Sequence, residues 1–551
     1  VGNCQGGWAV MMLAASRPDI AGPCVINGAP ISYWAGNDGE NPMRYLGGLA
    51  GGAWPALFAS DLGAGKFDGA HLVRNFEYLN PANTLWEKHY HLWSNVDTET
   101  ARFLEFERWW GGFYLFNDQE IRWIVNNLFV GNKLSAGDAR LGPGRFFDLK
   151  SIKSPIIVFA SMGDNITPPQ QAFNWIADVY GSTDEIKARG QVIVGLLHQD
   201  VGHLGIFVSG KVATKEHRQI VSVMKSIEAL PPGIYGMAIQ ERKGRGGEVE
   251  YTVEFREQRL EDIVKRLNRF ERQDEQPFEA VAEISEFNQR AYELFAQPLV
   301  QAMSSQYTAK LARQLHPLRA QRWAFSDLNP WLGWLGPAAE VVKANRRPAA
   351  KENVLAKVEG AVSEAISASL DYYRGMRDAT SEALFFQAYG NVFSLFIAEK
   401  RGAKRTMQPI ADARELPFVK NALAAIEKGG FPAALARVGY LLALKGEPLL
   451  LSRLELRRDL IEKHRDLLPD VGMDEWRRIR GEQEIIARYE PERALATLPK
   501  LLADPADRER FRALLRSLLA DEAFVHRAQP NPMQLAMMET IGEALEVPAA
   551  R

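Results

Sequence analysis

A cysteine lies between glycines close to the start of the sequence. The stretch GNCQGG at residues 2–7 places Cys4 between Gly2 and Gly6, and a run of helix formers follows it. Small residues flank a nucleophile where a strained turn brings backbone and side chains very close together. A helix N-terminus behind such a turn favours the thiolate form of a cysteine. The stretch therefore predicts a nucleophilic Cys4 on a sharp turn, with Gly2 and Gly6 providing the room.

A carboxylate and an imidazole follow further along the chain, each beyond a predicted strand. Asp164 comes after the β-branched run IIVFA, and His203 comes after the run VIVGLL. The order nucleophile, acid, base is the order of the α/β-hydrolase triad. In that arrangement His203 takes the proton of Cys4, and Asp164 holds the imidazole in the required tautomer. The backbone N–H of Gln5 is the predicted oxyanion-hole donor.

Each of these short patterns also occurs in ordinary turns, and two residues compete for the roles. His198 lies five residues before His203. Its position beside GLL places it at the end of the strand rather than in the following loop, so it ranks second as the base. Cys24 begins an apolar strand and is predicted to be an inert core residue. The conjunction of three such residues in the required order favours Cys4, Asp164 and His203.

Strands and helices alternate through the first 230 residues. A parallel sheet with helices on both faces is the arrangement that this alternation favours. The predicted elements are a helix at 5–16, strands at 23–30, 154–164 and 191–197, and helices at 168–180 and 212–230.

The sequence between residues 31 and 145 has a different character. It holds seven tryptophans and many glycines, and it interrupts two strands of one sheet. This is far longer than an ordinary connection. We interpret it as a cap inserted over the C-terminal edge of the sheet, where α/β proteins bind ligands.

Beyond the first 230 residues the sequence predicts two further regions. Residues 231–258 are predicted to form a connecting β-hairpin around a Gly-rich basic turn. Residues 259–551 are predicted to be a mostly α-helical domain, with a bundle favoured over a repeat array. Within it, Trp331 and Trp334 either contact a hydrophobic surface or pack between helices.

Composition excludes several classes of function. The chain of 551 residues is 46% hydrophobic and 24% charged, with a net charge of −2, so no strong field favours nucleic acid or an acidic membrane. No apolar run approaches the roughly 20 residues of a spanning helix. Its two cysteines and nine scattered histidines predict no disulfide scaffold, no metal site and no cofactor. We expect a cytoplasmic protein, and a homo-oligomer stays open.

The motifs around the three residues resemble those of the poly(3-hydroxyalkanoate) synthase family. GNCQGG is similar to that family's nucleophile elbow, GDNITPP to its acid loop and VGHLGIF to its base loop. Other stretches, such as INGAPISYWAG, are similar to uncharacterised bacterial proteins described as 3-hydroxyalkanoate synthetase-like. The synthase resemblance covers residues 1–230, and the helical half has no counterpart in it.

The resemblance implies an activity and a substrate. Cys4 would take an acyl group from a 3-hydroxyacyl-CoA thioester, and a hydroxyl acceptor would then attack the acyl-cysteine. Two alternatives stay open, namely an ester or thioester hydrolase with the same triad and a non-catalytic, granule-associated or binding protein. An α/β-hydrolase core places about five strands before its elbow. We therefore expect an incomplete, N-terminally truncated domain and a chain that is a fragment of a longer protein.

Overall fold

The fold is given by a computed structural model, which divides the chain into two compact units. The described residues are 1–243, 249–269, 272–347, 350, 352–394, 396, 413–443, 449–450, 459, 463–521 and 531–546. The first unit comprises residues 1–36, 133–272 and 405–551, and the second comprises residues 37–132 and 273–404.

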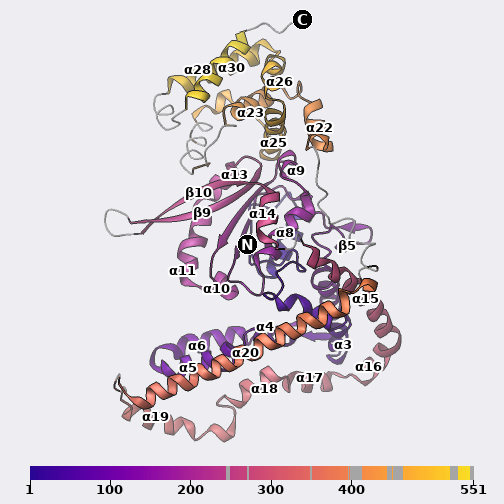
Figure 1. The fold of residues 1–551 in the computed structure, drawn as a ribbon, viewed down its shortest axis with the longest axis vertical. Coiled ribbons are helices and arrows are strands. Elements are labelled where there is room, and N and C mark those ends of the chain that lie inside the picture. The colour runs from indigo at the N-terminus through magenta and orange to yellow at the C-terminus, as the bar shows by residue number, and fades with distance from the viewer. Residues whose placement is uncertain are drawn as a thin grey trace. The chain divides into compact units, whose positions relative to one another are not determined.

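A mixed seven-stranded sheet forms the centre of the first unit (Figure 1), with strand order β1-β2-β7-β8-β9-β10-β11. The first five strands pair in parallel, and the last two pairings are antiparallel. The predicted α/β class is thereby confirmed. The strands are β1 (Gly2–Asn3), β2 (Cys24–Asn27), β7 (Ile156–Ser161), β8 (Val192–His198), β9 (Gly233–Lys243), β10 (Val249–Gln258) and β11 (Leu449–Leu450).

Helices cover both faces of this sheet because its central strands are apolar on both sides. Every residue of β2 and β7 is buried. Val25 belongs to a core with Ile220 of α12 (Arg218–Ser222), whereas the neighbouring Ile26 lies against α1 (Gly6–Ser16). Successive strand residues point to opposite faces, so these two contacts lie on opposite sides of the sheet. Another helix, α8 (Pro169–Tyr180), follows β7 and is almost entirely buried.

Helices from the end of the chain complete the first unit. Several of them share one buried core, which includes Phe431, Ile485 and Phe511. They are α22 (Pro417–Ala424), α23 (Gly430–Ala443), α25 (Met473–Tyr489), α26 (Pro491–Ala496), α27 (Leu498–Leu501), α28 (Pro505–Ala520) and α30 (Pro532–Glu546). Arg480 of α25 donates to the carbonyl oxygen of Leu230 at 3.2 Å. This bond joins the C-terminal helices to the segment between β8 and β9.

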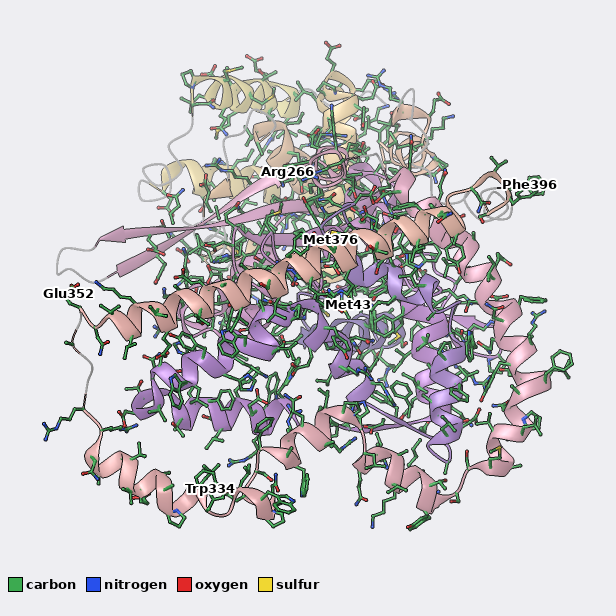
Figure 2. The ribbon with its side chains drawn as sticks, turned by 60° about the horizontal axis from the view of Figure 1, so that its bottom comes forward. Met43, Arg266, Trp334, Glu352, Met376 and Phe396 are labelled. Carbon is green, nitrogen blue, oxygen red and sulfur yellow. The ribbon has the colours of Figure 1, made fainter. Side chains whose placement is uncertain are left out.

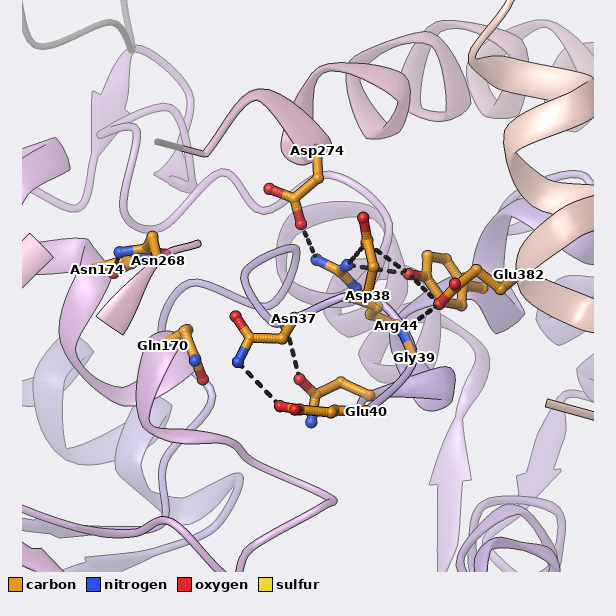
Figure 3. Close-up of polar contacts among 12 residues, drawn as sticks. Asn37, Asp38, Gly39, Glu40, Arg44, Gln170, Asn174, Asn268, Asp274 and Glu382 are labelled. Carbon is orange, nitrogen blue, oxygen red and sulfur yellow. Dashed lines mark hydrogen bonds and ion pairs between the residues drawn. The ribbon is translucent and has the colours of Figure 1, made fainter. Parts of the chain in front are cut away.

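The second unit is built around a buried arginine. Arg44 pairs with Asp38 at 2.6 Å and with Asp274 at 2.9 Å, and its side chain is fully buried (Figure 3). Tyr45 beside it donates to Glu382 at 3.0 Å. The inserted segment 37–132 is thus joined to α15 (Gln276–Ala291), just after Asp274, and to α20 (Val354–Tyr389), which carries Glu382.

The chain therefore divides differently from the three regions predicted from sequence. The helical segment 259–551 is not one unit, because residues 273–404 group with the insertion and residues 405–551 group with the sheet. The hairpin predicted at 231–258 is present as β9 and β10, but β9 pairs with β8 and so extends the main sheet instead of connecting two domains. That the segment 31–145 covers Cys4 remains a prediction.

Of the two arrangements considered for Trp331 and Trp334, packing between helices is not the one observed. The two tryptophans are 81% and 66% exposed, on a 3₁₀ turn and just before α19 (Leu335–Asn345). In the part of the chain that the structure describes, no helix combines the length and the apolar character needed to cross a membrane.

Candidate active site

Cys4 lies at a strained turn between β1 and α1. Its φ is 51°, in the left-handed region that non-glycine residues rarely adopt, and its backbone N–H donates to the carbonyl oxygen of Asn27 at 2.8 Å. Such backbone strain persists only where the surrounding structure holds it, and it gathers at functional sites. The strand–turn–helix order and the positive φ give Cys4 the geometry of the predicted elbow.

Two glycines make this turn possible, and one of them differs from the prediction. A Cβ on Gly2 would lie 2.5 Å from the carbonyl oxygen of Gly6, so Gly2 is required as predicted. A Cβ on Gly6 would meet nothing within 4 Å, so the prediction for Gly6 is wrong. The close approach is made by Gly7, where a Cβ would lie 2.3 Å from that of Ala29. Only the tertiary packing of α1 on the exit of β2 decides which glycine is needed.

Asp164 and His203 form a buried pair at the exits of β7 and β8. The Nδ1 of His203 lies 2.6 Å from Oδ2 of Asp164, and the two side chains are 5% and 0% exposed. The other carboxylate oxygen, Oδ1, accepts the backbone N–H groups of Ile166 and Thr167, each at 2.9 Å. Both oxygens of Asp164 are therefore engaged, which fixes the carboxylate. His203 was predicted in a loop but is the first residue of α10 (His203–Val208).

The thiol of Cys4 lies beside the imidazole of His203. Burial alone would lower the pKa of His203, but its hydrogen bonds to Asp164 and Cys4 raise that pKa to about 10. Because Nδ1 is engaged by Asp164, Nε2 is the nitrogen left for the sulfur atom. The structure thus brings together Cys4, His203 and Asp164, three residues predicted from their positions in sequence.

The remaining predicted residues take distinct places. The backbone N–H of Gln5 donates no hydrogen bond within the described part of the chain, and Gln5 directly precedes α1. His198, the competing base, accepts from the N–H groups of Asp200 and Val201, each at 3.3 Å. It is not paired with Asp164. Cys24 is buried, and burial raises its pKa.

Two residues of this site were missed from sequence. Gly28, at the exit of β2, has φ of 51°, and a Cβ there would lie 3.4 Å from both Oδ2 of Asp164 and Cε1 of His203. Burial raises the pKa of Tyr33, and the proximity of Cys4 raises it further. The Asn-Gly turn after the strand was a visible signal for Gly28. Nothing local in the sequence indicated Tyr33.

The described residues contain no group of three or more His, Cys, Asp or Glu side chains that could hold a metal ion.

The fold and the motifs define an α/β protein with a cysteine at a strand–turn–helix elbow. The chain belongs to the family described as "Protein of unknown function (DUF3141)", whose model matches residues 1–426. It is 40% identical over 517 residues to a Rhizobium meliloti protein described as "Uncharacterized protein in ackA 5'region". That alignment covers 92% of this chain and 70% of the relative.

A more distant similarity is confined to part of the chain. It is 26% identical over 229 residues to "Poly(3-hydroxyalkanoate) polymerase subunit PhaC" of Thiocystis violacea, covering 39% of this chain and 56% of that protein. The corresponding subunit of Allochromatium vinosum is 26% identical over 228 residues, with the same coverage. The chain thus spans about half the length of these polymerase subunits. No solved structure matches it significantly.

Proposed function

We propose that this protein is a Cys-dependent acyltransferase that acts on 3-hydroxyacyl-CoA thioesters through an acyl-Cys4 intermediate. The observation that carries the proposal is the buried Asp164–His203 pair beside a cysteine held at positive φ. We also propose that the first unit has an α/β-hydrolase fold with Cys4, His203 and Asp164 as its triad, and that residues 31–145 act as its cap.

The proposed reaction has two half-reactions. The Cys4 thiolate attacks the thioester carbonyl carbon, the C–S bond to CoA breaks, and the departing thiolate takes a proton from His203. A hydroxyl acceptor then gives its proton to His203 and attacks the acyl-cysteine, which forms an ester and releases the Cys4 thiolate. Asp164 keeps Nε2 of His203 directed at the sulfur atom throughout.

The oxyanion formed in each half-reaction needs hydrogen-bond donors. The N–H of Gln5 is the donor that we assign, because it lies next to the nucleophile at the start of α1. The raised pKa of His203 means that its imidazole is charged at neutral pH. A charged imidazole stabilises the thiolate, which is the reactive form of a cysteine.

The similarity to the two polymerase subunits supports the substrate class, since their names describe them as subunits of a poly(3-hydroxyalkanoate) polymerase. A hydrolase would use the same triad, with water in place of the hydroxyl acceptor. A non-catalytic binding role is favoured by a different observation, the exposure of Trp331 and Trp334. The fate of the acyl group on Cys4 distinguishes these three functions.

The test is peptide mass spectrometry after incubation with 3-hydroxybutyryl-CoA. We expect release of free CoA and one acyl mass on the peptide that contains Cys4. Cys4→Ser should abolish the thioester adduct and His203→Asn should nearly abolish it. Cys24→Ser and His198→Asn are the matched controls and should retain it.

The product then separates transfer from hydrolysis. Growth of an oligoester, or transfer to an added alcohol, identifies a transferase, whereas accumulation of free 3-hydroxybutyrate identifies a hydrolase. No adduct on Cys4 with any thioester tested, while Cys4 reacts with an alkylating agent no faster in the presence of His203 than in its absence, would contradict both enzymatic functions.

A further inference from the structure

Helix α20 exposes an apolar stripe that nothing in the described chain covers. At 36 residues it is the longest helix in the described part of the chain, and Figure 2 shows it with Met376 labelled. Only three of its residues are buried, namely Ser363, Phe385 and Tyr389. The large apolar side chains Leu355, Val358, Val362, Tyr372 and Met376 are between 53% and 77% exposed. A surface helix normally places charged residues on its outer face.

The distribution of charge on α20 is the reverse of that expectation. The acidic and basic residues of its second half are partly buried on the face toward the rest of the second unit; they are Asp371, Arg374, Arg377, Asp378 and Glu382. That face is held by specific contacts, for example Trp86 Nε1 donating to Ser363 and Tyr389 donating to the carbonyl oxygen of Gly48. The outer face is therefore the one that lacks a partner among the described residues.

The exposed residues follow the spacing of a coiled coil. They recur at alternating intervals of three and four, which keeps a seam on one side of a helix paired with another helix. The seam consists of Leu355, Val358, Val362, Ala365, Ser369, Tyr372, Met376, Ala379 and Ala383, and all nine are exposed. It runs for about 42 Å at 1.5 Å per residue. A partner must supply a helix of similar length.

We propose that α20 pairs with α20 of a second copy of this chain, in antiparallel orientation, to form a two-fold symmetric dimer. An isologous interface needs a self-complementary surface, and this seam is one. Centred between residues 370 and 371, antiparallel pairing places a small residue opposite a large one at successive layers. The facing pairs are Val358 with Ala383, Val362 with Ala379, Ala365 with Met376, and Ser369 with Tyr372.

The parallel alternative fits less well. It would place Tyr372 against its own copy, while Ala365 and Ala379 would each face an alanine and leave space unfilled. Cores pack best where large and small residues alternate across the contact. From residue 360 to residue 381 the seam and its flanking positions carry no charge, so no like-charge repulsion opposes self-pairing.

Light scattering coupled to size exclusion tests the assembly. We expect a mass twice the 61.7 kDa of one chain. Ala365→Glu would introduce two charges into the seam, and we expect it to raise the dimer dissociation constant more than about 100-fold. Ala365 is exposed in the single chain, so this variant should keep its circular dichroism spectrum; Ala379→Glu is a second such variant. Ala356→Glu, in the first turn of the same helix and off the seam, is the matched control and should stay dimeric.

Disulfide crosslinking tests the orientation, in a background where Cys4 and Cys24 are serine. Chains carrying both Val362→Cys and Ala379→Cys should crosslink into dimers on oxidation. Chains carrying Val362→Cys alone should not, because antiparallel pairing separates the two copies of residue 362 by about 25 Å and a disulfide needs Cα atoms within about 7 Å. A monomeric mass at every soluble concentration, a dimer that Ala365→Glu leaves intact, or crosslinking through residue 362 alone would each overturn the proposal.

Discussion

Two helices, one from each unit, place their side chains in opposite environments. Of the 12 residues of α8, all but Asp178 are buried, whereas α20 buries three of its 36. The first helix completes its packing inside one chain and belongs to the unit that carries Cys4, His203 and Asp164. The second completes only one face. This contrast matches the two proposals, a catalytic site in the first unit and an association surface on α20.

Removal of the buried arginine should have the largest effect on the second unit. Arg44→Ala leaves Asp38 and Asp274 without their cation, and breaking such a buried pair costs about 3–5 kcal/mol. We expect a marked fall in the unfolding midpoint, measured by urea titration. Arg17→Ala breaks the exposed pair with Asp19 and should change the midpoint little. Asp38, Asp274 and Glu382 lie in the second unit, so an equal loss from both substitutions would contradict the role of Arg44 there.

In the first unit, the two glycines that flank Cys4, Gly2 and Gly6, should differ in their effect on stability when each is replaced by alanine. Gly2→Ala forces a Cβ to within 2.5 Å of a backbone oxygen, and overpacking of this kind costs about 1–3 kcal/mol. Gly6→Ala meets nothing and should stabilise α1 slightly, because alanine loses less entropy in a helix. Thermal unfolding of the two variants checks the contrast. If Gly6→Ala proves the more harmful, the elbow is not packed as described.

A smaller effect on the free energy of unfolding is expected from a change of pH. The pKa of His203 is raised to about 10, so the charged imidazole stabilises the folded state fully below about pH 6.5, the ordinary histidine pKa. This contribution is lost as the pH rises through 10, because above that pH the His203 imidazole is neutral in both the folded and the unfolded chain. The free energy of unfolding of the wild-type protein minus that of His203→Asn should therefore shrink between about pH 6 and pH 10.

Nuclear magnetic resonance of the imidazole separates the two causes. Asp164→Asn and Cys4→Ser should each lower the pKa of His203, since hydrogen bonds to both residues raise it and the bond to Asp164 is the largest single raising cause. An unchanged pKa in Asp164→Asn would show that the hydrogen bond does not control the imidazole.

The comparison also shows which parts of the molecule could be predicted from sequence. The convergence of Cys4, Asp164 and His203 was predictable because each follows a strand, and the carboxyl ends of parallel strands meet at one edge of a sheet. The need for glycine at position 7 instead of 6 was not predictable, because it depends on Ala29 across the turn. The residues next to Gly7 in the sequence do not indicate that contact.

The division of the helical region 259–551 between the two units could not be predicted from local sequence patterns either. Helical periodicity indicates that a segment has an apolar face but not which segment covers it. Here residues 37–132 pack with helices more than 200 positions later, through Arg44, Asp274 and Glu382. The exposed seam of α20 was equally hidden, because an apolar stripe has the same sequence whether it packs within one chain or against another.

The central claim, that His203 activates Cys4, is tested most directly by the rate of Cys4 alkylation. The rate of iodoacetamide labelling is measured at neutral pH on the Cys4 and Cys24 peptides of one sample, in the wild-type protein and in His203→Asn. We predict that Cys4 reacts faster in the wild type than in His203→Asn, because a charged imidazole beside the sulfur atom stabilises the reactive thiolate, while Cys24 stays slow in both. Equal Cys4 rates in the two proteins would contradict the claim.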